Sequence, residues 1–237
     1  MFNLTDEQAK ALTAAIQQKI EADAKESVKE FDKLLDAVVD KLEPEGWTLP
    51  MGLTIYAINV IGKTDKITDI NGFLKWYFSQ DNYKATQEMV DSILASNIKN
   101  GLKKMTSECW SAFQNGLYAI CSISLLSIIE GILSEFSEDK QDTRMMKVCQ
   151  KQVDTFPIDG ETIEKHIWVS YNRFIRNLYQ KSDFNSDEPN TVNRHWLLHG
   201  RSDFEIDELD CIRLFNAVVS LCSVVNKDKK GNEIENQ

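Results

Sequence analysis

The chain has 237 residues, which is enough for one large domain or two small ones and for a sizeable core. Its net charge of −10 at pH 7 and its pI of about 4.9 argue against unspecific binding to nucleic acid or to an anionic membrane, but they leave room for a local basic cleft. Only 10 glycines and 4 prolines occur, which favours long helices over a turn-rich β fold.

The cysteines and the N-terminus predict a cytoplasmic protein without a bound metal, cofactor or membrane. No two of the 5 cysteines lie at a zinc-ligand spacing and no histidine lies near them in the sequence, so we expect reduced, buried thiols. Residues 1–7 have neither the basic nor the apolar segment of a signal peptide. The longest apolar run, residues 120–133, is interrupted by serines and Glu130, and it is predicted to be too short and too polar to cross a bilayer.

Residues 1–44 are predicted to form one long amphipathic helix, or two helices with a slight break between them. Neither glycine nor proline occurs between Asp6 and Leu42, and apolar residues recur there every three or four positions. Pro44 and Gly46 are expected to end the helix. A helix of this length either packs along the whole domain or extends far enough to contact a second copy of the chain.

Residues 45–72 are the least helical part of the chain. The glycines and prolines around Trp47 make its start turn-rich, and the apolar residues 53–61 suit either a short helix or an extended segment. We interpret this segment as an intramolecular lid or brace. The next helix is expected from about residue 73 to residue 96, and the residues able to break it are Gln80, Asp81 and Asn82.

The remaining chain completes an all-α fold, a bundle with long antiparallel helices. Residues 102–136 are predicted to form a single helix that is apolar on more than one face from Tyr118 onward, so it should be the buried central helix. One helical domain at 45–225 is expected to share its core with the N-terminal helix and to precede a flexible tail at 226–237. Further helices are expected within that domain at about residues 143–154, 161–179 and 206–225.

Two polar residues stand out within these helices. Glu130 lies in the apolar run, where a carboxylate is costly to bury without a partner. It either orients an arginine or histidine of a functional site, or it reaches solvent or pairs with an ordinary arginine. His166 lies in the first half of the 161–179 helix, and we expect it to be a surface or packing residue.

The stretch from Asn193 to Gly200 brings two of the three histidines of the chain next to an arginine. Arginine offers a fixed fork of donors to phosphate oxygens and histidine exchanges protons near neutral pH, so these residue types suit work on a phosphate. Arg194 and His199 are five positions apart, which on a helix separates their directions by about 140° and their heights by roughly 7.5 Å. They either line one wide cleft or meet a second copy across a symmetric interface. The alternative, that Arg194 pairs with an acidic group and His199 merely ends a helix, stays open.

This stretch resembles the HEPN superfamily of small all-helical domains. That family carries an arginine, four to six further residues and a histidine, with a polar residue directly after the arginine, and Arg194, His195 and His199 match this pattern. Residues 47–50 and the run from 117 to 132 also look like bacterial proteins of this kind. The resemblance spans roughly residues 45–225 and rests on short motifs.

The resemblance implies a helical bundle that forms a symmetric dimer in which two motifs face one cleft. It also implies a metal-independent endoribonuclease of toxin–antitoxin pairs or of abortive infection in phage defence, with RNA as substrate and an antitoxin as a possible protein partner. Attack of the ribose 2′-OH on the adjacent phosphorus would use His199 as general base or acid and Arg194 to hold the phosphate. Asn193 and His195 would support this pair, together with Glu130.

Further basic residues between 165 and 201 are candidates for holding the RNA. We place Arg173, Arg176 and Arg201 on the rim of the cleft, unless they are solvated helix charges. The main competing function is a non-catalytic HEPN-like module that binds RNA, a nucleotide or a partner protein, and the acidic net charge favours it. A third reading is a helical regulatory protein in which the motif only fixes a loop.

Overall fold

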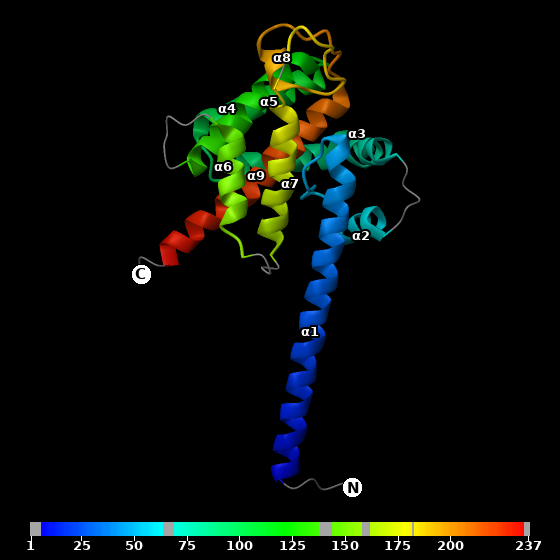
Figure 1. The fold of residues 1–237 in the computed structure, drawn as a ribbon, viewed down its shortest axis with the longest axis vertical. Helices are drawn as coiled ribbons and strands as arrows, with labels where there is room; N and C mark the ends of the chain where they lie inside the picture. Colours follow the sequence, from blue (N-terminus) through cyan, green and yellow to red (C-terminus); the bar gives the residue numbers. More distant parts are fainter. Residues whose placement is uncertain (1–5, 64–68, 138–143, 158–161, 182, 235–237) are drawn as a thin grey trace.

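A computed structural model describes residues 6–63, 69–137, 144–157, 162–181 and 183–234, and in this part of the chain it contains helices and no strand. The predicted all-α class is therefore confirmed. Figure 1 shows the helices gathered into one bundle, from which the N-terminal helix projects. For residues 6–13 and 226–234 only the backbone is described.

The N-terminal helix α1 (Asp6–Leu42) has the predicted length, and the 3-10 turn η1 (Glu43–Glu45) follows it. Gly46 then takes a φ of +71°, a left-handed conformation that glycine adopts without strain. Only the last third of α1 packs on the bundle, through Leu34, Leu35, Val38 and Leu42, and residues 14–31 are exposed. The helix therefore does not pack along the whole domain (Figure 1).

The segment after α1 is a brace between other helices, as one of the two interpretations predicted. Leu49 donates its backbone N–H to Ser170 Oγ at 2.7 Å, and Asn216 donates its side-chain amide to the Thr48 carbonyl oxygen at 3.1 Å. The short helix α2 (Ile55–Lys63) then packs on α1 so closely that a Cβ at Gly62 would lie 2.3 Å from Leu34. Residues 64–68 of this segment lie outside the described residues.

Helix α3 (Ile70–Ala95) is interrupted where its sequence predicted a break. Gln80 is extended, and Asp81, Asn82 and Tyr83 have positive φ angles of 49°, 57° and 62°. The break extends one residue beyond the predicted one. It lets α3 change direction before it packs on the last helix, α9 (Glu208–Ile234).

The prediction of a single helix at 102–136 is wrong. The structure has two helices, α4 (Asn100–Gln114) and α5 (Tyr118–Leu133), followed by the 3-10 turn η2 (Ser134–Phe136). Gly116 separates α4 from α5 with a φ of +70°, and the Leu117 N–H bonds back to the Ala112 carbonyl at 2.9 Å. The two helices therefore fold against each other, as the contact of the Cys109 thiol with the Cys121 carbonyl at 3.8 Å also shows.

Helix α5 is the central helix, as predicted, and packs between α4 and α9. By length and composition alone, residues 118–136 would also be able to cross a membrane, with a mean hydropathy of 1.7, so the prediction that this run is too short and too polar does not hold on composition. In the bundle, 44% of this stretch is buried, and Ile120 and Ile123 are exposed. Its buried residues are Cys121, Ser122, Leu125, Leu126, Ile128, Ile129, Ile132 and Leu133.

The second half of the chain adds α6 (Met145–Asp154) and α7 (Ile163–Leu178), which pack on each other, and α9. The predicted end of the last helix near residue 225 is too early, because α9 continues to Ile234. All five cysteines lie in helices and are buried, and none of them forms a disulfide, as predicted. The polar segment between α7 and α9 carries one further helix, which lies at the opposite end of the bundle from the free end of α1 (Figure 1).

Candidate functional site

That further helix is α8 (Arg194–Leu198), and its start follows from the chemistry of Asn193. The Asn193 Oδ1 accepts the backbone N–H groups of His195 at 2.9 Å and Trp196 at 3.3 Å, which an asparagine N-cap does for the orphan donors of a first turn. Its Nδ2 donates to the Gln180 carbonyl oxygen at 3.2 Å. Asn193 is 4% exposed, so this buried amide fixes α8 to the end of α7.

The other end of α8 is closed as predicted. His199 is the C-cap residue, and Gly200 takes a φ of +61°. Trp196 is buried and packs its ring edge to face with Phe184, with centroids 5.2 Å apart. The Arg201 N–H returns to the Trp196 carbonyl at 3.0 Å. The short helix is therefore held at both ends and by one aromatic anchor, so its outward residues have a defined position.

Arg194 forms an ion pair with the carboxylate that stood out in the sequence. Its Nε donates to Glu130 Oε1 at 2.8 Å, and the two side chains are 26% and 29% exposed. The Tyr179 hydroxyl donates to the same Glu130 oxygen, and the Arg194 guanidinium lies 5.5 Å from the centre of the Tyr179 ring. Glu130 therefore pairs with the arginine that its functional reading named, and the role of this pair stays a prediction.

The protonation states of Arg194 and Tyr179 are fixed near neutral pH. The hydrogen bond to Glu130 raises the pKa of Arg194 above its already high usual value. Burial, and then the hydrogen bond to Glu130, raise the pKa of Tyr179, so its hydroxyl keeps its proton and acts as a donor. Because Glu130 engages the Nε edge of the guanidinium, the Nη edge is oriented and is not part of this ion pair. An arginine held in this way suits an anion with two oxygens.

The two histidines of the motif lie beside this cluster. Their rings are parallel within 6°, with centroids 6.4 Å apart, as positions four residues apart on a helix allow. Tyr179 contacts the His195 ring edge to face at 6.2 Å, whereas His199 is exposed and contacts Phe184 at 5.9 Å. Burial first, and then the charge of Arg194 and the neighbouring His199, lower the pKa of His195.

Arg194 and His199 have different surroundings. Among the residues that the structure describes, no hydrogen bond joins them, and the guanidinium turns toward α5 while the His199 ring turns toward Phe184. One chain therefore presents a phosphate-type donor and a proton-exchanging group on the same short helix but not as a contact pair.

The three arginines predicted to hold RNA have different surroundings. Arg201 lies near the motif, with its guanidinium 4.4 Å from the centre of the Phe184 ring. Arg173 pairs with Asp40 at 2.7 Å and with Glu43 at 2.9 Å, and Arg176 donates to Gln150 on α6. The role of these two arginines in holding RNA stays a prediction. Both arginines lie on α7, but each is turned toward the neighbouring helix that supplies its partner.

Sequence reasoning missed two residues of this site. Tyr179 was recognised only as the end of a predicted helix, and Phe184 only as part of a polar loop. No spacing rule connects Tyr179 with Glu130, which is 49 positions away. The single aromatic residue in an otherwise polar loop was the one signal that could have indicated the role of Phe184, because such a residue needs an apolar partner.

No protein-family model, curated protein or solved structure matches the chain. Within the described ranges no group of three or more histidine, cysteine, aspartate or glutamate side chains is placed to hold a metal ion. The fold and the site thus define an all-helical protein with an arginine–histidine surface on a capped short helix, and the chemistry of that surface has to carry the functional argument.

Proposed function

We propose that the protein is a metal-independent endoribonuclease of the HEPN type, acting in the cytoplasm in phage defence by abortive infection or in a toxin–antitoxin system. The observation that carries this proposal is the arrangement of α8. Arg194 is held through its Nε by Glu130, and on the same helix His199 is exposed to solvent. If Arg194 only fixed the loop, the protein would need neither an oriented guanidinium nor an exposed histidine on the same helix.

The chemistry uses one proton transfer on each side of a phosphorus atom. His199 removes the proton of a ribose 2′-OH, whose oxygen forms a bond to the adjacent phosphorus. The bond from phosphorus to the 5′-oxygen of the next nucleotide breaks, and a protonated histidine returns a proton to that oxygen. Arg194 neutralises the charge that develops on the phosphoryl oxygens. The products are a 2′,3′-cyclic phosphate and a 5′-hydroxyl end, so atoms and charge balance without a further reactant.

A symmetric dimer completes this proposal. Since Arg194 and His199 of one chain point in different directions, one phosphate is reached by both residue types when two α8 helices face each other across a two-fold axis. Asn193 then acts as the cap that fixes α8, and His195 supports His199 through the parallel ring contact. An antitoxin or another regulatory protein would act by covering this surface.

A second candidate is a non-catalytic HEPN-like module that binds RNA or a partner protein. Two observations favour it: the net charge is −10, and Glu130 partly neutralises Arg194. In such a module the ion pair would fix α8, and the exposed histidines would only form part of a contact surface.

The test is cleavage of an end-labelled mixed RNA pool in EDTA by the wild type and by Arg194→Ala and His199→Ala. Arg176→Ala is the matched control, because it removes another arginine from the same end of the bundle whose partner is Gln150 and not the site. We expect cleavage by the wild type and the control, cyclic-phosphate ends, and a loss of about 100-fold or more in the other two variants.

Thermal unfolding of all four proteins shows whether the folds are equal. Cleavage that survives in both site variants would place the active site elsewhere. A well-folded wild type that binds RNA without cleaving it, and loses binding in Arg194→Ala, would favour the binding module instead.

A further inference from the structure

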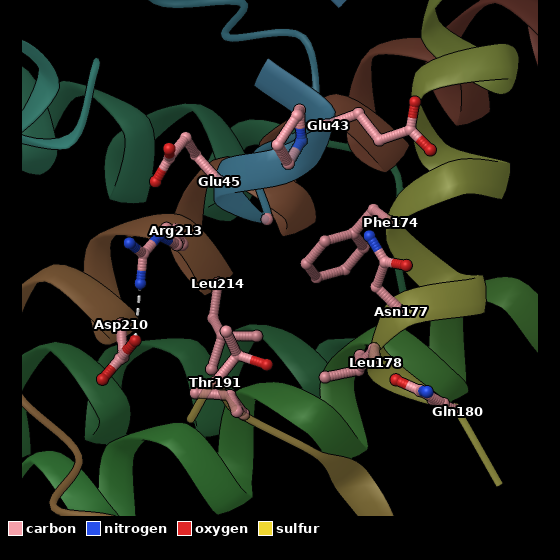
Figure 2. Close-up of a pocket in the computed structure, with 13 residues that line it drawn as sticks. Glu43, Glu45, Phe174, Asn177, Leu178, Gln180, Thr191, Asp210, Arg213 and Leu214 are labelled. Atoms are coloured by element: carbon pink, nitrogen blue, oxygen red, sulfur yellow. Dashed lines mark hydrogen bonds and ion pairs between the residues drawn. The ribbon is translucent and has the colours of Figure 1, made fainter. Parts of the chain in front are cut away.

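A cavity of about 430 Å³ borders the segment that leads into α8, because Thr191 and Val192 line it. Figure 2 shows it between α7 and α9, with η1 above it and the segment around Thr191 below it. Arg194 and His199 are not among its lining residues. Val192, which precedes the N-cap Asn193, and Gln180, whose carbonyl accepts the Asn193 amide, both line it. The cavity and the arginine–histidine surface therefore share one wall.

The cavity combines an apolar floor with a rim of amides. Phe174, Leu178 and Leu214 are buried at 7%, 3% and 2% exposure, and the Phe174 ring extends from α7 into the space opposite Leu214 (Figure 2). Asn177 and Gln180 lie at the exposed rim, and among the described residues their side-chain amides have no hydrogen-bond partner. A flat ring beside a solvent-facing pair of amides suits a planar ligand with hydrogen-bonding edges.

The carboxylates around the cavity already have partners, which limits the kinds of ligand that the cavity can bind. Glu43 pairs with Arg173, Glu45 accepts the Asn71 amide, and Asp210 pairs with Arg213 at 2.7 Å. The Glu43 and Glu45 side chains also leave the turn on opposite sides and point outward (Figure 2). The acidic lining disfavours a phosphate, and a cationic ligand would have to compete with the partners that these carboxylates already hold. We therefore consider a neutral, planar group with polar edges.

We propose that this cavity takes a nucleobase, with adenine the best match. The side-chain amides of asparagine and glutamine each present a donor beside an acceptor, the pattern that adenine shows at N6 and N7. A ring contact with Phe174 supplies the stacking that bases gain on aromatic side chains. A cavity of about 430 Å³ is large enough for a nucleoside. The further step, that the base belongs to an RNA strand whose phosphate reaches Arg194, rests on the proposed function. The fit of a nucleobase to the cavity is independent of that function.

Calorimetric titration of the full chain with adenosine, guanosine, cytidine and uridine tests the cavity without any need for cleavage. We expect adenosine to bind most tightly, and Asn177→Leu and Gln180→Leu each to weaken it roughly tenfold. Gln87→Leu is the matched control, since its amide pairs with Asp91 on α3. Thr191→Trp, at an exposed rim position, should fill the cavity and abolish binding.

A 2′-O-methyl adenosine hexamer, which cannot be cleaved by 2′-OH attack, identifies the source of the base. Tighter binding of the hexamer than of adenosine, lost in Thr191→Trp, identifies an RNA strand, and equal binding identifies a free nucleoside. The proposal is overturned if neither ligand binds the wild type at millimolar concentration, or if the three cavity variants bind like the control. A protein that binds adenosine and cleaves no RNA would contradict only the proposed function.

Discussion

In the described part of the bundle, arginine, histidine and carboxylate side chains meet both between α1 and α7 and at α8, and the two clusters differ in how the charges are shared. Between α1 and α7, His166 pairs with Asp32 and Asp36, and Arg173 pairs with Asp40 and Glu43. At α8, Arg194 shares one carboxylate, Glu130, with the Tyr179 hydroxyl. In the first cluster, His166 and Arg173 each contact two carboxylates. In the second cluster, Arg194 contacts one among the described residues.

This difference separates a structural seam from a candidate site. His166 is 4% exposed and lies between two helices, so it has no route to a ligand. His199 is exposed, and the Nη edge of Arg194 is not part of the Glu130 ion pair. Residue types alone do not distinguish the two clusters. Exposure and the number of carboxylates for each cation do, because a guanidinium enclosed by two acids has little attraction left for a phosphate.

Among the substitutions that test the difference between the two clusters, a change at Glu130 is expected to have the largest effect on RNA cleavage. Glu130→Ala leaves the Arg194 Nε and the Tyr179 hydroxyl without their shared acceptor, so the guanidinium loses its orientation. We expect the kcat of RNA cleavage to fall about tenfold to 100-fold with a smaller change in KM. Glu130→Gln keeps an acceptor oxygen and should recover a part of the activity. Equal activity of the alanine variant and the wild type would mean that the ion pair only holds α8 in place.

A smaller effect, on stability alone, is expected at Arg173. Its partners Asp40 and Glu43 are 67% and 40% exposed, so Arg173→Ala should lower the free energy of unfolding by about 0.5–1 kcal/mol. Urea denaturation with and without 0.5 M salt measures this loss, which should shrink at high salt. RNA cleavage should stay at the wild-type level. A loss of cleavage without a loss of stability would restore Arg173 to the site and remove the contrast between the clusters.

The smallest effect is expected from the titration of His195. The pKa of His195 is lower in the folded chain than in the unfolded chain, where it is near 6.5. Between these two pKa values the unfolded chain therefore binds more protons than the folded chain. Stability from this group is therefore complete above about pH 6.5 and falls as the pH drops through the folded pKa. His195→Gln should show a weaker decline in unfolding free energy between pH 7.5 and pH 5 than the wild type. An identical decline would mean that neither burial nor the charge of Arg194 disfavours the protonation of this ring.

Local sequence signals predicted most of the fold because helix periods and end residues act over a few positions. Gly200 ends α8 and Asn193 caps it, as their side chains require. The prediction of a single helix across Gly116 was wrong. The apolar pattern continues through the break, so it hides the end of α4 at Gly116, where glycine takes a left-handed conformation without strain.

The candidate site was predictable in part. The motif indicated Arg194, His195 and His199, and the isolated carboxylate indicated Glu130, because a charge in an apolar run needs a partner. Tyr179 could not be predicted, since its contact with Glu130 depends on how α7 ends beside α5. The ion pair of Arg173 with Asp40 could not be predicted either, because the position of Arg173 in the sequence does not show which side of α7 faces α1.

The sequence by itself determined that the chain is helical, where α1 and α8 begin or end, and which residue types could act on a phosphate. Only the tertiary structure decided which charges neutralise each other. The same apolar period runs along all of α1, yet residues 14–31 are exposed while Leu35 and Val38 are buried, because the bundle reaches only the last third of the helix. Periodicity specifies a face, and packing specifies whether another part of the chain covers it.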